Sequence, residues 1–576
     1  MARLTIGICV LVVFVAASTA AGAAPADSDV ARAAGGATLG APGGAAIASA
    51  NGLATDAGME ILAAGGNAFD AAVAVTGVLA VVEPTSSGLG GGALMLLHRA
   101  DGFEVMLDGR ETAPAAAKNE LFWDKSGALD RDLSVNGPLA AGIPGEPAAL
   151  VHLAAHYGKL PLASSLAPAI RIARNGFPVY GKFRRQLGSR LEVVRRYPHT
   201  ARIFLTDGKL PDEGFVIRQP DLQRTLESLA KRGNDGFYRG EVARKLVRGV
   251  RANGGVWTER DLASYRVVER EPIRFDYRGY RIVTAPSPSS GGVLLATMLN
   301  TLSGYDLTAL PRTDRVHVLV EIMRRVYRDR AQNLGDADFV DAPFERLLSP
   351  HYAAGLRAGI RLDRATPSAM LPGIETHPGG TDTSHFSIID SAGNIVAATV
   401  SVNLPFGSAF MSPGTGVVLN NEMDDFALKA GASNAYGLVG NEANAIEPGK
   451  RPLSSMTPTL VIGANRVAVL GTPGGSRIIS MVLLGILDFI DGASPADWVA
   501  KPRLHHQYLP DAISAEAGAL SAEEMQALRA RGHTINESES TWGNMQALVW
   551  DRRTGALSGG TDPRGGAGKV ALAPAR

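Results

Sequence analysis

Residues 379–390 read Gly-Gly-Thr-Asp-Thr-Ser-His-Phe-Ser-Ile-Ile-Asp, with Thr383 at the first position of a predicted strand. Two β-prone runs, 385–390 and 395–402, flank the turn-forming Ser-Ala-Gly-Asn at 391–394, which predicts a β-hairpin. Thr383 therefore lies on a rigid edge rather than in a flexible tail. A hydroxyl residue there is usually an ordinary turn or edge residue, so a function for Thr383 has to come from the rest of the chain.

Cleavage of the bond between Asp382 and Thr383 would change the chemistry of this threonine. A threonine hydroxyl alone is a poor nucleophile, but the new α-amino group would lie beside Oγ and could serve as its base. A free α-amine titrates at about 7.7 to 8.0, close to neutral pH. The preceding residues 362–381 are rich in proline and glycine, which predicts a loop able to adopt a self-cleaving geometry.

Five further segments resemble the γ-glutamyltranspeptidase family in order and spacing. They are LDGRETAP at 107–114, VN at 402–403, NNEMDDF at 420–426, RPLSSM at 451–456 and TPGGSR at 472–477. The resemblance covers nearly the whole chain after about residue 43, from GGNAFDAA at 65–72 to DPR at 562–564. Members of that family are N-terminal-nucleophile hydrolases, made as inactive precursors that cleave themselves before the nucleophilic threonine.

The resemblance implies an α/β fold, the four-layer αββα sandwich of N-terminal-nucleophile hydrolases, built by the large and small subunits of one self-cleaved precursor. After a flexible Ala/Gly-rich segment at 24–42, the large subunit would span 43–382 and the small catalytic subunit 383–576. The two would stay together as a heterodimer. Strand order cannot be derived from the sequence.

Hydrophobic periodicity predicts elements that can be compared with that fold. The predicted helices span 55–64, 68–82, 314–330, 477–490 and 521–531, within a mainly helical region at 147–335. The predicted strands span 93–98 and 103–107 and lie near 385, 395, 417, 459, 466 and 546. The strand pair at 93–107 would deliver Arg110 just past a strand end.

A γ-glutamyl group carries an α-carboxylate, which calls for a cation and hydroxyl groups. By the resemblance, Arg110 would bind this carboxylate with its planar guanidinium, and Ser454 and Ser455 would add donors. Seen alone, these would more often be a surface arginine and a Ser-Ser turn. Their joint match to the family positions favours binding.

The α-ammonium of the same group calls for acids. Glu422 and Asp425, three residues apart, would converge on it, with Asn403 as a further acceptor. A solvated acidic patch is the ordinary alternative. Retention of both acids favours γ-glutamyl substrates over the glutaryl-type side chains, lacking an α-ammonium, that β-lactam acylases of the family cleave.

Three further positions carry expected catalytic roles. Gly474 and Gly475 follow a proline and could present successive backbone N–H groups to an oxyanion, since no Cβ is in the way. Ser401 falls where the family commonly has a second threonine that supports the nucleophile, and its hydroxyl could do the same. Leu404-Pro405 replaces a more polar pair often found there, which puts the acceptor side in doubt.

Residues 427–440 resemble the lid loop that some bacterial members lay over the glutamyl pocket. Tyr436 would be its cover. A buried core tyrosine is the alternative reading, because an aromatic residue flanked by glycine serves either purpose.

The combined hypothesis is a γ-glutamyl hydrolase or transferase. Thr383 Oγ would form a γ-glutamyl ester from glutathione or related compounds and pass the group to water or to amino acid or dipeptide acceptors. The alternative that is not an enzyme is an inactive binding protein of the same fold that does not cleave itself. No metal or organic cofactor is expected.

The N-terminus predicts export. Arg3, an apolar run from Leu4 to Ala17 and the sequence Ala21-Gly22-Ala23 fit a signal peptide spanning residues 1–23. The run is shorter than the about 20 residues of a membrane span, so we expect a periplasmic or secreted protein without a stable span. The single cysteine, Cys9, lies in this run, so the mature protein would contain no disulfide.

The sequence gives less support to other functions. With 57 basic and 56 acidic residues the net charge is +1, so nothing indicates a nucleic-acid partner. Gly88–Ala93 satisfies a dinucleotide-binding pattern, but a helical run precedes it and a strand-like run follows, the reverse of what that motif needs. His152 and His156 lie four residues apart on a predicted helix, yet no nearby acid offers a third metal ligand.

Overall fold

The computed structural model describes residues 40–371, 383–429, 432–438 and 440–574. Residues Gly40–Arg576 form one compact unit. The predicted signal peptide, the flexible segment up to residue 39 and Asp382 of the expected cleavage site lie outside the described residues. Among the residues that are described, no helix is both long and apolar enough to cross a membrane.

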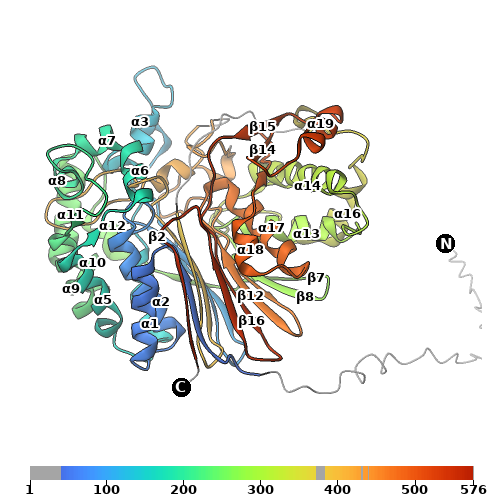
Figure 1. Ribbon diagram of the computed structural model, residues 1–576. Coiled ribbons are helices and arrows are strands. Elements are labelled where there is room, and N and C mark those ends of the chain that lie inside the picture. Colours follow the sequence, from blue (N-terminus) through green and yellow to red (C-terminus); the bar gives the residue numbers. More distant parts are fainter. Residues whose placement is uncertain (1–39, 372–382, 430–431, 439, 575–576) are drawn as a thin grey trace, which may run out of the picture. The chain divides into compact units, whose positions relative to one another are not determined.

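Two large antiparallel sheets form the centre of this unit (Figure 1). The first has the order β18 (Lys569–Pro574), β1 (Gly44–Ser49), β9 (Ser384–Ile389), β10 (Ile395–Ser401), β2 (Gly92–His98), β3 (Glu104–Gly109) and β6 (Val268–Arg270). The second has the order β17 (Leu557–Thr561), β16 (Gln546–Asp551), β12 (Arg466–Gly471), β11 (Thr459–Ile462), β8 (Tyr280–Thr284) and β7 (Ile273–Tyr277).

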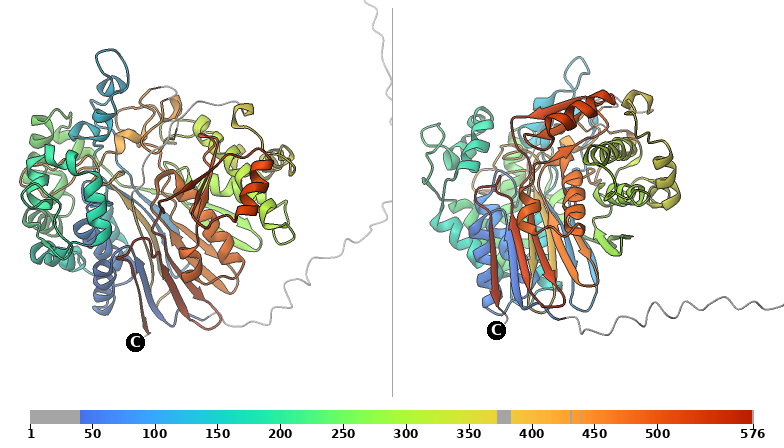
Figure 2. Two further views of the ribbon diagram at one scale, coloured as in Figure 1. Left: turned by 45° about the horizontal axis from the view of Figure 1, so that its top comes forward. Right: turned by 45° about the vertical axis from the view of Figure 1, so that its right-hand side comes forward.

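Helices cover the outer face of each sheet, as the views of Figures 1 and 2 show. The first sheet is covered by α1 (Gly52–Ala63), α2 (Ala68–Val82), α4 (Glu146–His156), α5 (Leu162–Asn175), α9 (Pro220–Arg232) and α11 (Gly240–Ala252). The second is covered by α13 (Gly291–Leu302), α14 (Arg312–Asn333), α17 (Ile478–Ile490), α18 (Pro495–Ala500) and α19 (Ala522–Ala530). The four layers make the αββα sandwich of N-terminal-nucleophile hydrolases.

Smaller elements complete the layers. They include α3 (Arg131–Val135), α6 (Gly181–Ser189), α7 (Leu191–Arg196), α8 (Pro198–Phe204), α10 (Asp235–Tyr238), α12 (Glu259–Ser264), α15 (Phe344–Leu348), α16 (Pro350–Ala358) and the strands β4 (Phe177–Pro178), β5 (Val216–Ile217), β13 (Leu504–His505), β14 (Ile513–Glu516) and β15 (Ile535–Ser538).

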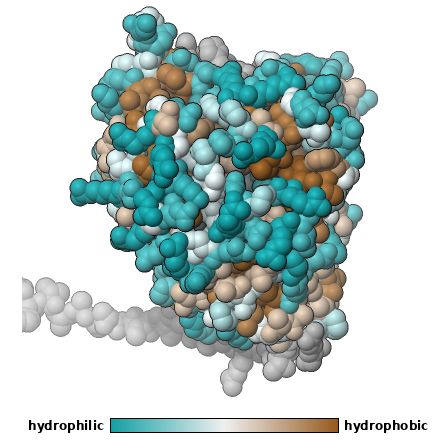
Figure 3. Space-filling model, turned by 90° about the vertical axis from the view of Figure 1, so that its left-hand side faces the viewer, coloured by the Kyte–Doolittle hydropathy of each residue, from teal (hydrophilic) through white to brown (hydrophobic). Residues whose placement is uncertain are grey.

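The period-2 alternation of β10 explains why the sheets lie between two apolar layers. Val396 and Val400 point into the core shared with α2, whereas Ile395 and Ala397 point into a separate core between the sheets. Because successive side chains of a strand face opposite ways, a strand that is apolar throughout must be covered on both faces. The helical face shown in Figure 3 is by contrast mostly hydrophilic.

Several predicted elements are confirmed. The hairpin exists as β9 and β10, paired antiparallel with Ser384 opposite Val400. The predicted helix at 68–82 has those bounds as α2, because Asn67 and Asp70 form a reciprocal capping box at its start and Pro84 prevents its continuation.

Other predictions were wrong or incomplete. No strand forms near 417, where only isolated bridges join Met411 to Val418 and Gly90 to Leu419. The region at 147–335, read as mainly helical, also contains β6, β7 and β8. β7 is an edge strand whose residues Ile-Arg-Phe-Asp-Tyr alternate between a more buried apolar face and an exposed polar face, so the period-2 signal of a strand was present in this segment.

Candidate active site

Thr383 lies immediately before β9, at the end of the first sheet, and is only 3% exposed. Its Oγ1 is 3.2 Å from Oγ of Ser401, the last residue of β10. The antiparallel register of the hairpin brings the two hydroxyls together. Asn403 donates its backbone N–H to Ser401 Oγ at 2.8 Å, which fixes the serine hydroxyl beside the threonine.

A small cavity surrounds this hydroxyl pair. It is lined by Thr383, Ser401, Asn403, Arg110, Glu422, Asp425, Ser454, Ser455, Tyr436 and Gly475, and by Arg330 among others. The structure thus gathers from distant parts of the chain every predicted site residue except Gly474 and the undescribed Asp382. Its free volume is about 20 Å³, room for about one water, so a substrate requires the pocket to open.

Arg110 is the centre of a buried ion cluster. It lies just past the end of β3, as predicted, and is 1% exposed. Its Nη1 is 2.7 Å from Glu422 Oε2, and its Nη2 donates to Asp425 Oδ2 at 2.7 Å. Glu111 Oε2 lies 3.3 Å from Nη1. The predicted carboxylate-binding cation and the predicted ammonium-binding acids are therefore paired with one another.

The pKa values of this cluster follow from burial and charge. Burial raises the pKa of Glu111 to about 7 and that of Glu422 well above its usual value, and the neighbouring carboxylates add to both shifts. Burial alone would lower the pKa of Arg110, but its three acidic neighbours raise it above the ordinary value. Arg110 is therefore always charged, while the acids share fewer than three negative charges near neutral pH.

Ser454 and Ser455 line the same cavity. Ser454 Oγ accepts the backbone N–H of Met456 at 3.0 Å, so its own hydrogen is free for another acceptor. Arg330, from α14, donates to Ser455 Oγ at 3.4 Å. Sequence reasoning missed Arg330, because an arginine within a helix carries no local sign of whether it faces the solvent or a pocket.

Gly474 and Gly475 form a turn that only glycine adopts readily. Their φ angles are 144° and 55°, both in the region that L side chains disfavour. A Cβ at Gly474 would lie 2.5 Å from Met481 Cε, and one at Gly475 would collide with the ring of Tyr436. The turn leads directly into α17, so its backbone N–H groups belong to a helix start, where anions are favoured.

Tyr436 closes the pocket over this turn. Its ring packs against Gly475 and its hydroxyl donates to the backbone oxygen of Asn403 at 2.6 Å. The side chain of Gln507 donates to the Tyr436 carbonyl at 3.3 Å. Tyr436 is 5% exposed, so it is both a buried tyrosine and a wall of the pocket.

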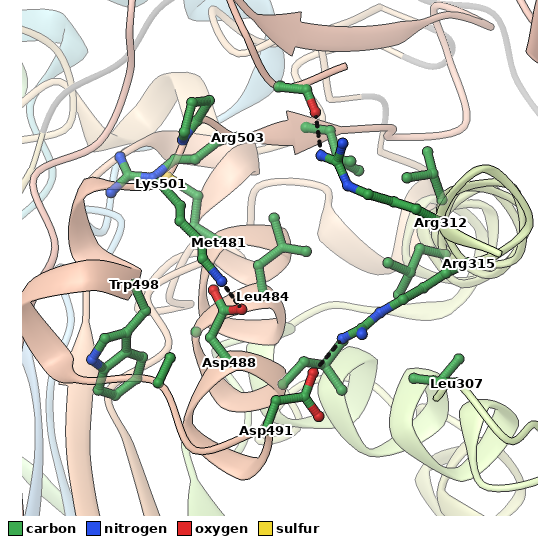
Figure 4. Close-up of a pocket in the computed structure, with 18 of the residues that line it drawn as sticks. Leu307, Arg312, Arg315, Met481, Leu484, Asp488, Asp491, Trp498, Lys501 and Arg503 are labelled. Carbon is green, nitrogen blue, oxygen red and sulfur yellow. Dashed lines mark hydrogen bonds and ion pairs between the residues drawn. The ribbon is translucent and has the colours of Figure 1, made fainter. Parts of the chain in front are cut away.

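A larger cavity lies between α14 and α17 (Figure 4). It has a volume of about 740 Å³, and ion pairs of Arg315 with Asp491 and Lys501 with Asp488 stand in its walls. None of the predicted site residues lines it. One of its lining residues, Met481, packs against Gly474 of the site.

The two competing sequence patterns have structural explanations. The glycine-rich turn at 88–92 follows helix α2 and precedes strand β2, and a Cβ at Gly90 would collide with Val418 O, so the glycines permit close packing. His152 has an acid after all, Glu269 Oε1 at 2.8 Å from Nε2, which the sequence analysis did not foresee. No group of three potential metal ligands occurs among the described residues.

Glu146, at the start of α4, provides a pH test of the buried acids around the site. It is fully buried, and burial together with the charge of Glu111 raises its pKa well above 4.5. Above pH 4.5 the unfolded chain loses this proton while the folded chain keeps it, so folding becomes less favourable as pH rises toward the folded pKa. Glu146→Gln should therefore raise Tm at pH 8, with a gain that shrinks toward pH 4.5.

The measurement is thermal unfolding of both proteins from pH 4.5 to 8. Glu60→Gln, at an exposed ion pair with Arg171, is the control and should show no such pH-dependent gain. A Glu146→Gln variant that loses stability at pH 8 would mean that the native carboxyl is ionised and paired.

Comparisons with known proteins agree with this geometry. The Gamma-glutamyltranspeptidase family profile matches residues 54–572. The chain is 43% identical over 492 residues to a glutathione hydrolase proenzyme of Pseudomonas sp. (strain A14), covering 84% of this chain and 85% of that protein. It is 37% identical over 528 residues to an acylase ACY 1 proenzyme of Pseudomonas sp. (strain SE83), covering 88% and 90%.

A solved structure is similar throughout. The crystal structure of cephalosporin acylase from Bacillus halodurans superimposes with a TM-score of 0.81 at 31% identity, covering 92% of this chain and 96% of that one. The matched family profile, the long alignments and the αββα layers all lead to one assignment. This chain is a member of the γ-glutamyltranspeptidase family of enzymes.

Proposed function

We propose that the protein is a self-processing γ-glutamyl hydrolase and transferase acting on glutathione and related γ-glutamyl compounds. The observation that carries the proposal is the buried pair of Thr383 Oγ1 and Ser401 Oγ at 3.2 Å in a pocket that also holds Arg110, Glu422 and Asp425. A nucleophile and a set of groups complementary to an amino acid headgroup thus share one cavity.

Maturation would use the same hydroxyl. Thr383 Oγ attacks the carbonyl carbon of Asp382, the peptide C–N bond breaks, and the nitrogen takes up a proton to become the α-amine of Thr383. Water then hydrolyses the resulting ester, which releases the Asp382 carboxylate and restores the hydroxyl. The products are the large subunit ending at Asp382 and the small subunit 383–576, which stay together because β9 and β10 are central strands of a sheet shared by both.

Catalysis would follow in two steps. The α-amine of Thr383 accepts the Oγ proton as Oγ attacks the γ-carbonyl of the donor, and the proton passes to the leaving amine. Backbone N–H groups of the Gly474-Gly475 turn stabilise the oxyanion. Water, or the amine of an amino acid or dipeptide, then attacks the γ-glutamyl ester on Thr383 and releases the product.

The acids of the pocket distinguish γ-glutamyl donors from glutaryl donors. Glu422 is buried and Asp425 half-buried beside Arg110, which is a costly arrangement unless a further cation completes it. The α-ammonium of a γ-glutamyl group supplies that cation, whereas a glutaryl group does not. Since relatives named acylases are similar to this chain, glutaryl β-lactam acylase activity is the second candidate function.

The test combines intact mass with two substrates. Incubation at neutral pH should give two fragments split between Asp382 and Thr383. The cut protein should have a kcat/KM about 100-fold higher for γ-glutamyl-p-nitroanilide than for glutaryl-p-nitroanilide, because the glutaryl group lacks the ammonium that would pair with the acids of the pocket. Preference for the glutaryl compound would assign the acylase function. A stable single chain would indicate an inactive relative.

The lid gives a separate prediction on acceptor choice. Tyr436→Phe removes the hydrogen bond to Asn403 O but keeps the ring, at a cost of about 1 kcal/mol to the closed lid. We expect a change of about fivefold in the ratio of transfer to hydrolysis, measured with glycylglycine as acceptor. Tyr277→Phe, on β7 of the other sheet, is the control. An unchanged ratio would make Tyr436 an ordinary core residue.

A further inference from the structure

Arg330 is a second buried guanidinium in the pocket of Thr383. It projects from α14 and is 5% exposed. Its Nε donates to Ser290 Oγ at 2.9 Å and its Nη2 donates to Ser455 Oγ at 3.4 Å. Both partners are neutral hydroxyls, and no carboxylate of the described residues forms an ion pair with it.

Arg110 and Arg330 differ in how much of each guanidinium is already paired with protein groups and how much could still bind a ligand. Arg110 already contacts the carboxylates of Glu111, Glu422 and Asp425, and its Nε donates to Pro452 O at 3.2 Å. Its capacity to bind a further anion is largely taken up. Arg330 has two hydroxyl partners and a guanidinium edge in the same cavity.

A buried cation without a counter-ion is unfavourable and gains most from an incoming anion. Burial lowers the pKa of Arg330 to about 10; the charge of Asp425, which is not in ion-pair contact with it, opposes this shift, and the charge of Arg110 adds to it. The side chain is therefore still protonated at neutral pH. The two arginines influence one another, so an anion bound between them would be attracted by both.

A chain of hydrogen bonds holds Arg330 toward the two serines. Ser290 accepts from Arg330 Nε and donates through its own hydroxyl to the carbonyl of Ser454 at 2.8 Å. Ser290 directly precedes α13. The guanidinium is thereby oriented by α13 and α14, the helices of the large-subunit segment, toward the Ser454-Ser455 wall of the small-subunit segment.

We propose that Arg330 is a specificity-determining residue that binds the α-carboxylate of the donor, between its own guanidinium and the hydroxyls of Ser454 and Ser455. The inference rests on the proposed γ-glutamyl function and refines it. On binding, the α-ammonium would take over Glu422 and Asp425, and the α-carboxylate would pair with Arg330 and the face of Arg110 that is released. The pocket thus exchanges internal ion pairs for pairs with a zwitterion.

The test compares three donors that differ only in their charged groups. The γ-glutamyl anilide has carboxylate and ammonium, the glutaryl anilide has only the carboxylate, and the 4-aminobutyryl anilide has only the ammonium. Arg330→Met should lower kcat/KM at least 30-fold for the two carboxylate donors, mainly through KM, as loss of a buried charge partner does. For 4-aminobutyryl anilide the change should stay within about threefold.

Two further variants separate binding from support of the fold. Arg330→Lys keeps the charge and should recover part of the loss for the carboxylate donors only. Arg328→Met, on the same helix and paired with Asp329, is the matched control and should alter none of the three donors. Tm and the extent of self-cleavage are measured for each, so that a misfolded variant is recognised.

The outcomes are distinct. Equal losses for all three donors in a folded, cut Arg330→Met protein, or an unchanged KM for the γ-glutamyl donor, would overturn the role of Arg330. If the unaltered protein is cut but has no γ-glutamyl activity, the proposed function fails instead. Inhibition by free glutamate and free 4-aminobutyrate gives a readout independent of turnover, and only the glutamate constant should rise in Arg330→Met.

Discussion

Thr383→Ala is expected to leave a single uncut chain and to lower turnover by about 10⁴-fold or more. The variant lacks the Oγ that attacks Asp382 and that later accepts the γ-glutamyl group, and losses of this size follow removal of a covalent nucleophile. The fold should persist, because Thr383 precedes β9 rather than filling a core. Intact mass and anilide hydrolysis measure the two effects.

Two variants make the result specific to the hydroxyl. Thr383→Ser keeps Oγ and should be cut and active at a reduced rate, since the lost methyl loosens its rotamer. Ser384→Ala removes the neighbouring hydroxyl, which donates to Glu83 Oε2 at 3.2 Å, and should still be processed. A cut and active Thr383→Ala protein would remove Thr383 from both roles.

Arg110→Met is expected to lower both donor affinity and stability. Arg110 contacts the buried carboxylates of Glu111 and Glu422 and the half-buried carboxylate of Asp425, and removing one partner of a buried ion pair costs about 3 to 5 kcal/mol. We expect Tm to fall by several degrees and KM for the γ-glutamyl donor to rise by about 100-fold or more, as follows from losing such a buried charge partner. The fraction of protein cut at Thr383 should fall much less than affinity does.

A second substitution can separate the two effects. Adding Glu422→Gln to Arg110→Met removes one stranded carboxylate and should restore part of the Tm without restoring KM. Arg171→Met, at an exposed ion pair with Glu60, is the control and should change Tm little. If affinity and self-cleavage fall equally in Arg110→Met, Arg110 supports the site rather than binding the donor.

Features that depend on neighbouring residues, such as a hairpin, helix ends and a glycine turn, could be predicted from the sequence. The hairpin of β9 and β10 follows from two β-prone runs and a four-residue turn, and helix α2 begins and ends at its capping residues. The positive φ values of Gly474 and Gly475 are what a Pro-Gly-Gly turn suggests. These features depend on neighbouring residues, so a single sequence contains them.

The tertiary structure alone decided which charges meet. The sequence suggested Arg110 for a carboxylate and Glu422 with Asp425 for an ammonium, but the fold pairs them with one another. It also places Arg330 in the pocket, more than 200 residues from Arg110 along the chain.

The sequence by itself therefore determined many of the elements, the family and the position of the expected nucleophile, because hydrophobic periodicity, caps and turns act over a few residues. The charge balance of the pocket depended on segments brought together from both sides of Thr383. Only packing of the four layers buries Arg110, Arg330 and the acids in one cavity. Burial then makes their charges strong and dependent on one another.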